Sequence, residues 1–275
     1  MGAQDSSYDP AVALAFFKSA GRPETIEPGA TIFAEQDKEI PLLKQNRIYL
    51  LLKGEVTLAA RGRPFGSVRP GEIFGELAVI DRAPRSASAV AKSACRVIAL
   101  DAKSFTAALR KQPAFALMLM SIMIHRLRET IARLRESGAL GRDEAWKEAA
   151  AFEPKDLAHL ARGLEENSAV FYMQGRPIMA EGQTGTRMYA VLEGRVAVSI
   201  EGRVVERLGP GGVFGEAALV NQRARMASAV AEIDSVLLPM GREAFLAMVK
   251  LSPEFADTVL SSLAERLRFL TARLP

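Results

Sequence analysis

The chain has 275 residues, and 49% of them are apolar, which is enough to fill the cores of two domains of ordinary size. Charged residues make up 25% and aromatic residues 7%, so the composition excludes a disordered, collagen-like or disulfide-stapled chain. The formal net charge of +4 is spread thinly over the whole length and does not by itself indicate a nucleic-acid binder.

The N-terminus and the single cysteine bear on the compartment. Residues 1–10 are polar and lack the basic start and apolar core of a signal peptide. Cys95 alone cannot form an internal disulfide or a thiolate metal site, so we expect a reducing, cytoplasmic compartment and no structural zinc. The longest apolar run, residues 114–124, is shorter than the roughly 20 residues that span a bilayer, so we expect no membrane partner.

An internal repeat organises the chain. Residues 70–91 and 210–231 match at 12 of 22 positions at a shift of 140. Upstream of these segments the shift becomes 146, so the first copy holds six extra residues, which we place in the loop around Asp37 to Asn46. The repeat predicts two domains of the same fold.

Each copy begins with short strands and ends in a long helix. Residues 48–60 and 188–200 alternate or run apolar between Gly and Pro turns, which predicts a small antiparallel barrel or jelly roll. Near the end of each copy, apolar residues recur at alternating steps of four and three, which is typical of a helix whose apolar stripe, or seam, packs against another helix. These seam residues are Met120, Ile124, Leu127, Ile131 and Leu134 in the first copy, and Leu260, Leu263, Leu267, Leu270 and Leu274 in the second.

The predicted fold class is mainly β with α, with two tandem β-jelly-roll domains that are each followed by a long C-terminal helix. We assign residues 1–136 to the first domain, 137–152 to a partly helical linker, and 153–275 to the second domain. The linker is long enough for the two seams to pair within one monomer. A homodimer in which each seam pairs with its twin is the alternative.

The segment FGELAVIDRAPRSASAV, residues 74–90, carries the most chemistry. Gly75 lets a ligand approach the backbone, and the amides that open a short helix can bind an anion. Arg85 can neutralise a phosphate with paired donors, while Glu76 can accept hydrogen bonds from a sugar hydroxyl. The same residues could instead form a turn and a buried strand joined by an ion pair, but their recurrence in the second copy favours a ligand site.

Residues 74–90 resemble the phosphate-binding cassette of the cyclic nucleotide-binding domain family, which includes the catabolite activator protein and the regulatory subunits of cyclic AMP-dependent protein kinase. The resemblance covers residues 28–135 and 174–274 in the family's order of barrel, cassette and terminal helix. It implies cyclic AMP as the ligand, with cyclic GMP possible because Ser86 can serve either purine. No cofactor acts as a catalyst in this interpretation.

The resemblance also implies two sets of site residues, with Glu76 on the ribose 2'-hydroxyl and Arg85 on the cyclic phosphate. The first set is Phe65, Phe74, Gly75, Glu76, Leu77, Arg85, Ser86 and Thr130. The second set is Val205, Phe214, Gly215, Glu216, Ala217, Arg225 and Met226. Met226 departs from the family pattern, which usually has a small or hydroxyl residue there. Phe65 can equally be a core residue and Thr130 a solvated helix residue.

Three function classes compete: a sensor whose terminal helices move on ligand binding, a transcriptional regulator that acts on DNA directly or through a partner, and an enzyme. The chain stops at Pro275, directly after the second seam, so we expect no helix-turn-helix and no direct contact with nucleic acid. His125 and His159 lie on separate stretches without acidic or cysteine companions, so we assign no metal ligand and no catalytic residue. We predict a bacterial, cytoplasmic regulatory protein with an unknown downstream protein partner.

Overall fold

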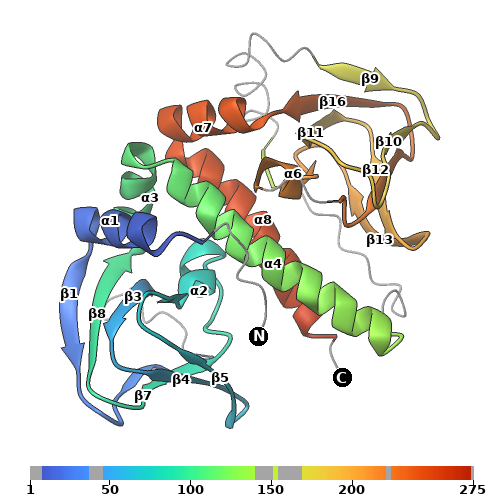
Figure 1. Ribbon diagram of the computed structural model, residues 1–275. Helices are drawn as coiled ribbons and strands as arrows, with labels where there is room; N and C mark the ends of the chain where they lie inside the picture. Colours follow the sequence, from blue (N-terminus) through green and yellow to red (C-terminus); the bar gives the residue numbers. More distant parts are fainter. Residues whose placement is uncertain (1–7, 37–45, 140–150, 154–168, 221–223, 274–275) are drawn as a thin grey trace. The chain divides into compact units, whose positions relative to one another are not determined.

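The computed structural model describes residues 8–36, 46–139, 151–153, 169–220 and 224–273. Two compact units, Met1–Phe115 and Ala116–Pro275, divide the chain (Figure 1). The boundary between the units falls after Phe115, so most of the long helix α4 (Ala114–Glu136) belongs to the second unit. The repeat instead predicts a domain boundary after residue 136, at the end of that helix. The loop with the six extra residues and most of the predicted linker helix lie outside the described residues.

The first unit is a jelly roll of two four-stranded antiparallel sheets, with strand orders β1-β8-β3-β6 and β2-β7-β4-β5. Its strands are β1 Arg22–Ile26, β2 Thr31–Phe33, β3 Arg47–Lys53, β4 Val56–Ala60, β5 Arg63–Val68, β6 Ile73–Phe74, β7 Ser88–Ala91 and β8 Cys95–Asp101. Its helices are α1 Pro10–Ala20, α2 Glu76–Ile80 and α3 Ala102–Lys111, and α4 starts at its end.

The two sheets enclose one apolar core. Rings from both sheets meet there, since Phe33, Tyr49 and Phe74 stack with centroids 5.1 to 6.1 Å apart. Small side chains of β7 fill the same core, because Ala89 and Ala91 are fully buried. Part of the run of small residues that follows Arg85 in the sequence therefore serves the core of the barrel.

Helix α1 was not predicted from the sequence. Asp9 caps it, because its carboxylate accepts hydrogen bonds from the amides of Ala11 (2.8 Å) and Val12 (3.4 Å). Phe16 on this helix is fully buried and stacks on Phe115 with ring centroids 3.6 Å apart. The helix thus completes the core of the first unit.

The second unit repeats the jelly roll, with strand orders β9-β16-β11-β14 and β10-β15-β12-β13. This identity of strand order confirms the predicted pair of tandem domains. Its strands are β9 Val170–Tyr172, β10 Pro177–Met179, β11 Met188–Glu193, β12 Val196–Ile200, β13 Arg203–Leu208, β14 Val213–Phe214, β15 Ser228–Ala231 and β16 Ser235–Met240. Its helices besides α4 are α6 Ala217–Val220, α7 Arg242–Leu251 and α8 Pro253–Thr271.

Each predicted terminal helix is preceded by a shorter one. The breaks fall at Pro113 and Pro253, because proline lacks the amide that would continue the preceding helix. No single helix among the described residues is long and apolar enough to cross a membrane. The pair α3 and α4 passes that test only when taken together across the sharp bend at their break.

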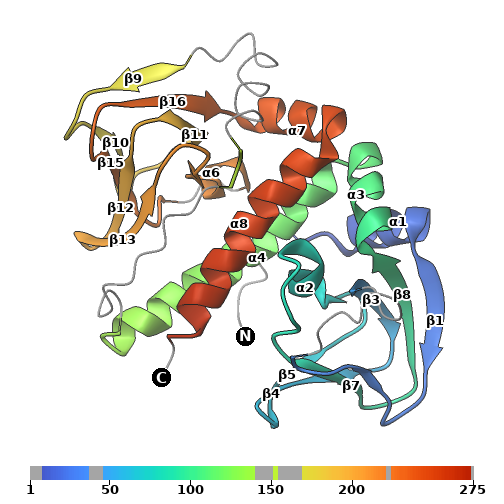
Figure 2. The same cartoon turned by 180° about the vertical axis from the view of Figure 1, so that it is seen from behind.

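Helices α4 and α8 lie side by side in both views (Figures 1 and 2). All five predicted seam residues of α4 are buried, as are Leu260, Leu263 and Leu267 of α8. Leu270 is half-buried, and Leu274 lies outside the described residues. Within one chain, the seam of α4 therefore has a helix beside it.

Pairing of the two seams within one chain predicts a monomer. Light scattering on the purified protein at micromolar concentration should give a mass near 29.8 kDa. A mass near twice that value would show that the seams pair between chains, as in the homodimer alternative.

Candidate functional site

The first cassette turns sharply at Gly75, between β6 and α2. The backbone φ of Gly75 is +75°, which places this residue in the left-handed region that favours glycine. Glu76 follows it and is buried, with 4% of its surface exposed. Phe74 precedes it and is part of the core, so both neighbours of the glycine are buried.

Arg85 is buried behind this turn. Its guanidinium donates hydrogen bonds to the carbonyl oxygen of Gly75 (2.7 Å) and to that of Arg47 (2.9 Å). The same group lies over the ring of Phe33, 4.1 Å from its centroid. Arg85 thus ties the cassette to the start of β3 and to the core.

The second cassette repeats this geometry. Arg225 donates to the carbonyl oxygens of Gly215 (2.8 Å) and Arg187 (2.7 Å), and Gly215 again has a φ of +75°. Burial lowers the pKa of Arg225, but a guanidinium remains a cation at any physiological pH. Two bonds use two of the five N–H donors of a guanidinium, so Arg225 keeps donors to offer to an anion.

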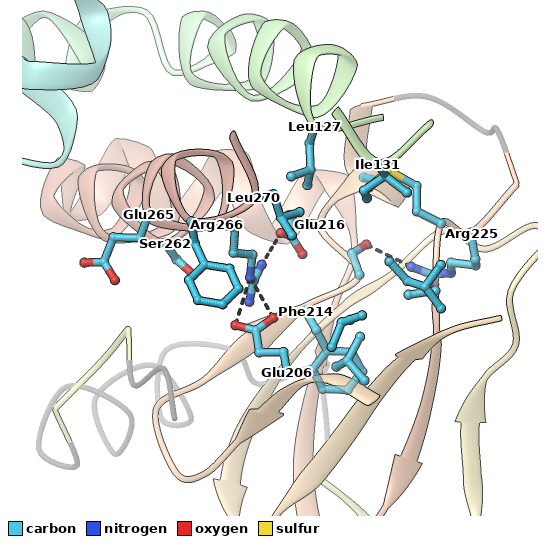
Figure 3. Close-up of a pocket in the computed structure, with 18 of the residues that line it drawn as sticks. Leu127, Ile131, Glu206, Phe214, Glu216, Arg225, Ser262, Glu265, Arg266 and Leu270 are labelled. Carbon is cyan, nitrogen blue, oxygen red and sulfur yellow. Dashed lines mark hydrogen bonds and ion pairs between the residues drawn. The ribbon is translucent and has the colours of Figure 1, made fainter. Parts of the chain in front are cut away.

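A cavity of about 320 Å³ opens in front of the second cassette (Figure 3). All seven residues predicted for the second site line it, from β13, β14, α6 and the loop before β15. Its volume lies at the lower end of the range of about 300 to 1,000 Å³ that is usual for small-molecule sites. The structure therefore brings the predicted second set together around one space.

Helix α4 supplies part of the cavity wall, which the sequence analysis missed. Leu127 and Ile131 point from α4 into the cavity (Figure 3). On the same helix, Arg128 donates to the carbonyl oxygen of Ala224, one residue before Arg225 (3.3 Å). The helix that ends the first repeat is thus bonded to the cassette of the second, and nothing local in the sequence signals this contact.

Helix α8 supplies the opposite part of the wall and a buried cation, Arg266. Its guanidinium lies 2.5 Å from Glu216 and 2.9 Å from Glu206, measured between nitrogen and carboxylate oxygen. Burial raises the pKa of Glu206, while Arg266 acts in the opposite direction. Burial lowers the pKa of Arg266, but the two carboxylates together outweigh this effect and raise it above the usual value. Neither Arg266 nor Glu206 was among the predicted site residues.

The remaining residues of the first set are placed as follows. Leu77 is half-buried and Ser86 is exposed, while the side chain of Phe65 lies outside what the structure describes. Thr130 belongs to the second unit, where its hydroxyl donates to the carbonyl oxygen of Arg126 one helical turn earlier (2.9 Å). Within the described ranges, no group of three or more His, Cys, Asp or Glu residues could hold a metal ion.

Comparison with known proteins identifies the family. The model described as "Cyclic nucleotide-binding domain" matches residues 23–112 and 169–252, which together are more than half of the chain. The chain belongs to the cyclic nucleotide-binding domain family. Both matches contain a complete cassette, and they end at the residues that precede α4 and α8.

Two curated proteins are similar to parts of this chain. The cyclic AMP receptor protein of Thermus thermophilus is 39% identical over 102 residues, 35% of this chain and 47% of that protein. A cyclic AMP-dependent protein kinase regulatory subunit of Aspergillus niger is 33% identical over 187 residues, 67% of this chain and 40% of that protein. The chain thus spans less than half the length of these two relatives.

Two solved structures are also similar to this chain. The regulatory domain of Toxoplasma gondii PKA with cyclic AMP is 22% identical, covers 96% of this chain and 90% of its own, and gives a TM-score of 0.32. The catabolite activator protein of Thermus thermophilus is 34% identical, covers 45% of this chain and 59% of its own, and gives a TM-score of 0.39.

The turn glycine of each cyclic nucleotide-binding domain can be tested against a matched glycine. A Cβ at Gly215 would lie 2.7 Å from Nη1 of Arg225, whereas a Cβ at Gly202, also at φ +75°, would meet nothing within 4 Å. Gly202→Ala should cost about 1 to 2 kcal/mol of unfolding free energy, which is the strain of the left-handed backbone alone. Gly215→Ala should cost measurably more in urea unfolding; equal costs would show that Arg225 does not depend on the turn.

Proposed function

We propose that this protein is a cyclic nucleotide sensor that binds cyclic AMP in the cassettes of both repeats and transmits binding through its terminal helices. The observation that carries the proposal is the cavity in the second unit, which places a buried carboxylate, Glu216, and a buried guanidinium, Arg225, beside one apolar space. The relatives named for cyclic AMP support the choice of ligand.

The phosphate fits the guanidinium. A cyclic phosphodiester carries one negative charge, and Arg225 offers one positive charge with donors in a planar fork. The hydrogen bonds to the carbonyl oxygens of Gly215 and Arg187 hold the guanidinium of Arg225 in place before any ligand binds, so little side-chain entropy is lost on binding. Arg85 has the same two kinds of bond in the first cassette.

The nucleoside fits the rest of the cavity. The carboxylate of Glu216 can accept a hydrogen bond from a ribose hydroxyl, while Arg225 binds the phosphate. The side chains of Val198, Ile200 and Val205 offer an apolar surface to a purine, and Phe269 of α8 adds a ring to the same cavity. Met226 joins this surface with a flexible thioether, so it supplies packing where Ser86 would supply a hydroxyl.

The elements that contact the ligand determine how its binding is transmitted. The cavity is lined by α4 and α8 as well as by the cassette, so a bound nucleotide contacts both helices. A ligand shifts the position of a helix only if it binds one position more tightly than the other. We propose that these helices present the signal to a downstream protein, and the proposal includes no catalytic step.

Removal of either cassette arginine should abolish one binding event. Arg85→Ala and Arg225→Ala should each cost about 2 to 5 kcal/mol of binding free energy at their own site, because a phosphate would then be buried without its counter-charge. Calorimetric titration with cyclic AMP should show two sites in the unaltered protein and one in each variant. Titration with cyclic GMP in parallel measures the preference for the base.

The matched control is Arg82→Ala, which removes an exposed arginine three residues before Arg85. This variant should keep both sites and both affinities. Unchanged affinity after the double substitution of Arg85 and Arg225 would contradict the proposed function. Prolonged incubation with cyclic AMP followed by chromatography tests the enzyme alternative, and we expect the nucleotide to be recovered intact.

The contribution of α4 to the second site can be measured separately. In an Arg85→Ala background, Ile131→Ala should weaken cyclic AMP binding about tenfold, because it removes apolar contact with the ligand. Arg133→Ala, an exposed change on the same helix, should leave the affinity unchanged. Equal affinity in both variants would show that α4 does not contact the nucleotide.

A further inference from the structure

Arg266 uses all three of its guanidinium nitrogens within the second unit. Nη1 bonds to Glu216 at 2.5 Å, and Nε lies 2.9 Å from a carboxylate oxygen of Glu206. Nη2 donates to the carbonyl oxygen of Val213 on β14. Figure 3 shows the side chain reaching down from α8 between the two carboxylates. One residue of the terminal helix is therefore bonded to β13, to β14 and to the cassette.

The three side chains in direct contact carry unequal charges, although Arg225 also acts on Glu216 from across the cavity. Two carboxylates face one guanidinium, and the side chains of Arg266, Glu206 and Glu216 are only 15%, 16% and 8% exposed. A buried pair of one cation and one anion would already be neutral, so the second carboxylate adds a desolvation cost. Such an extra buried charge calls for a role beyond stability.

The first repeat lacks the extra carboxylate. The shift of 140 carries Arg126 onto Arg266 and Glu76 onto Glu216, but it carries Gly66 onto Glu206. The first repeat forms the same strand with no side chain at this position, although a Cβ at Gly66 would meet nothing within 4 Å. Glu206 is thus an addition specific to the second repeat.

We propose that Glu206 is a positioning residue that holds Arg266 against Glu216 and so keeps α8 docked over the second cavity before any ligand binds. The bond from Glu206 orients the guanidinium along β13, so that Nη1 reaches the cassette carboxylate. Because Arg266 already occupies one oxygen of Glu216, a ligand hydroxyl must share this carboxylate with α8. Only this last consequence rests on the proposed function.

Hydrogen exchange of the full chain without ligand tests the docking directly. Glu206→Gln removes the charge, and Glu206→Gly restores the residue of the first repeat; both leave Arg266 paired with Glu216, so the fold should survive. We expect exchange in residues 264–271 to become about tenfold faster in both variants. Glu193→Gln, an exposed glutamate of the same unit, is the control and should not change exchange.

Exchange in β11 and β16 serves as the internal reference. Unchanged exchange in α8 of the Gly variant would overturn the proposal, and so would an equal acceleration in α8, β11 and β16, because that pattern indicates general destabilisation. Addition of cyclic AMP should slow exchange in α8 of the two Glu206 variants, because the bound nucleotide contacts this helix. Faster exchange of α8 without ligand, combined with no response to cyclic AMP, would leave the positioning role standing and contradict the proposed ligand.

Discussion

A buried guanidinium must be given its hydrogen bonds by the protein, and each cassette is built around one. Arg85 and Arg225 are both under 10% exposed, and each bonds to two main-chain carbonyl groups. One of those carbonyls belongs to the glycine of the sharp turn, and it can face the arginine only with the backbone in the left-handed region. The arginine thereby joins the turn to the start of an earlier strand, β3 in the first unit and β11 in the second.

The same requirement explains why the cassette residues serve both the fold and the ligand. The two carbonyl bonds of Arg225 use only two of the five N–H donors of its guanidinium, so this side chain can also bind an anion. Ala89 and Ala91 pack into the core, while Ser86 of the cassette is exposed. The alternative interpretation of these residues as core and turn was thus correct for some positions, and it is compatible with a ligand site at the others.

The long helices α4 and α8 lie outside the two segments that the family model matches. The family matches end at residues 112 and 252, directly before α4 and α8. In the second unit these helices add Leu127, Ile131 and Arg266 to the wall of the cavity. The matched segments thus contain the two cassettes, and in the second unit the long helices line part of the cavity beside one of them.

The sequence by itself determined the tandem jelly rolls, the two cassettes and the helical seams, because each rests on local spacing: a glycine beside a buried acid, an arginine nine residues later, apolar steps of four and three. It missed α1, although Asp9 and Pro10 are a helix start that could have been recognised. Only the tertiary structure placed α4 against the second cassette and Arg266 between two carboxylates. Those contacts join residues from 50 to almost 100 positions apart. Contacts between such distant residues produce no periodic pattern in the sequence, so they cannot be predicted from it.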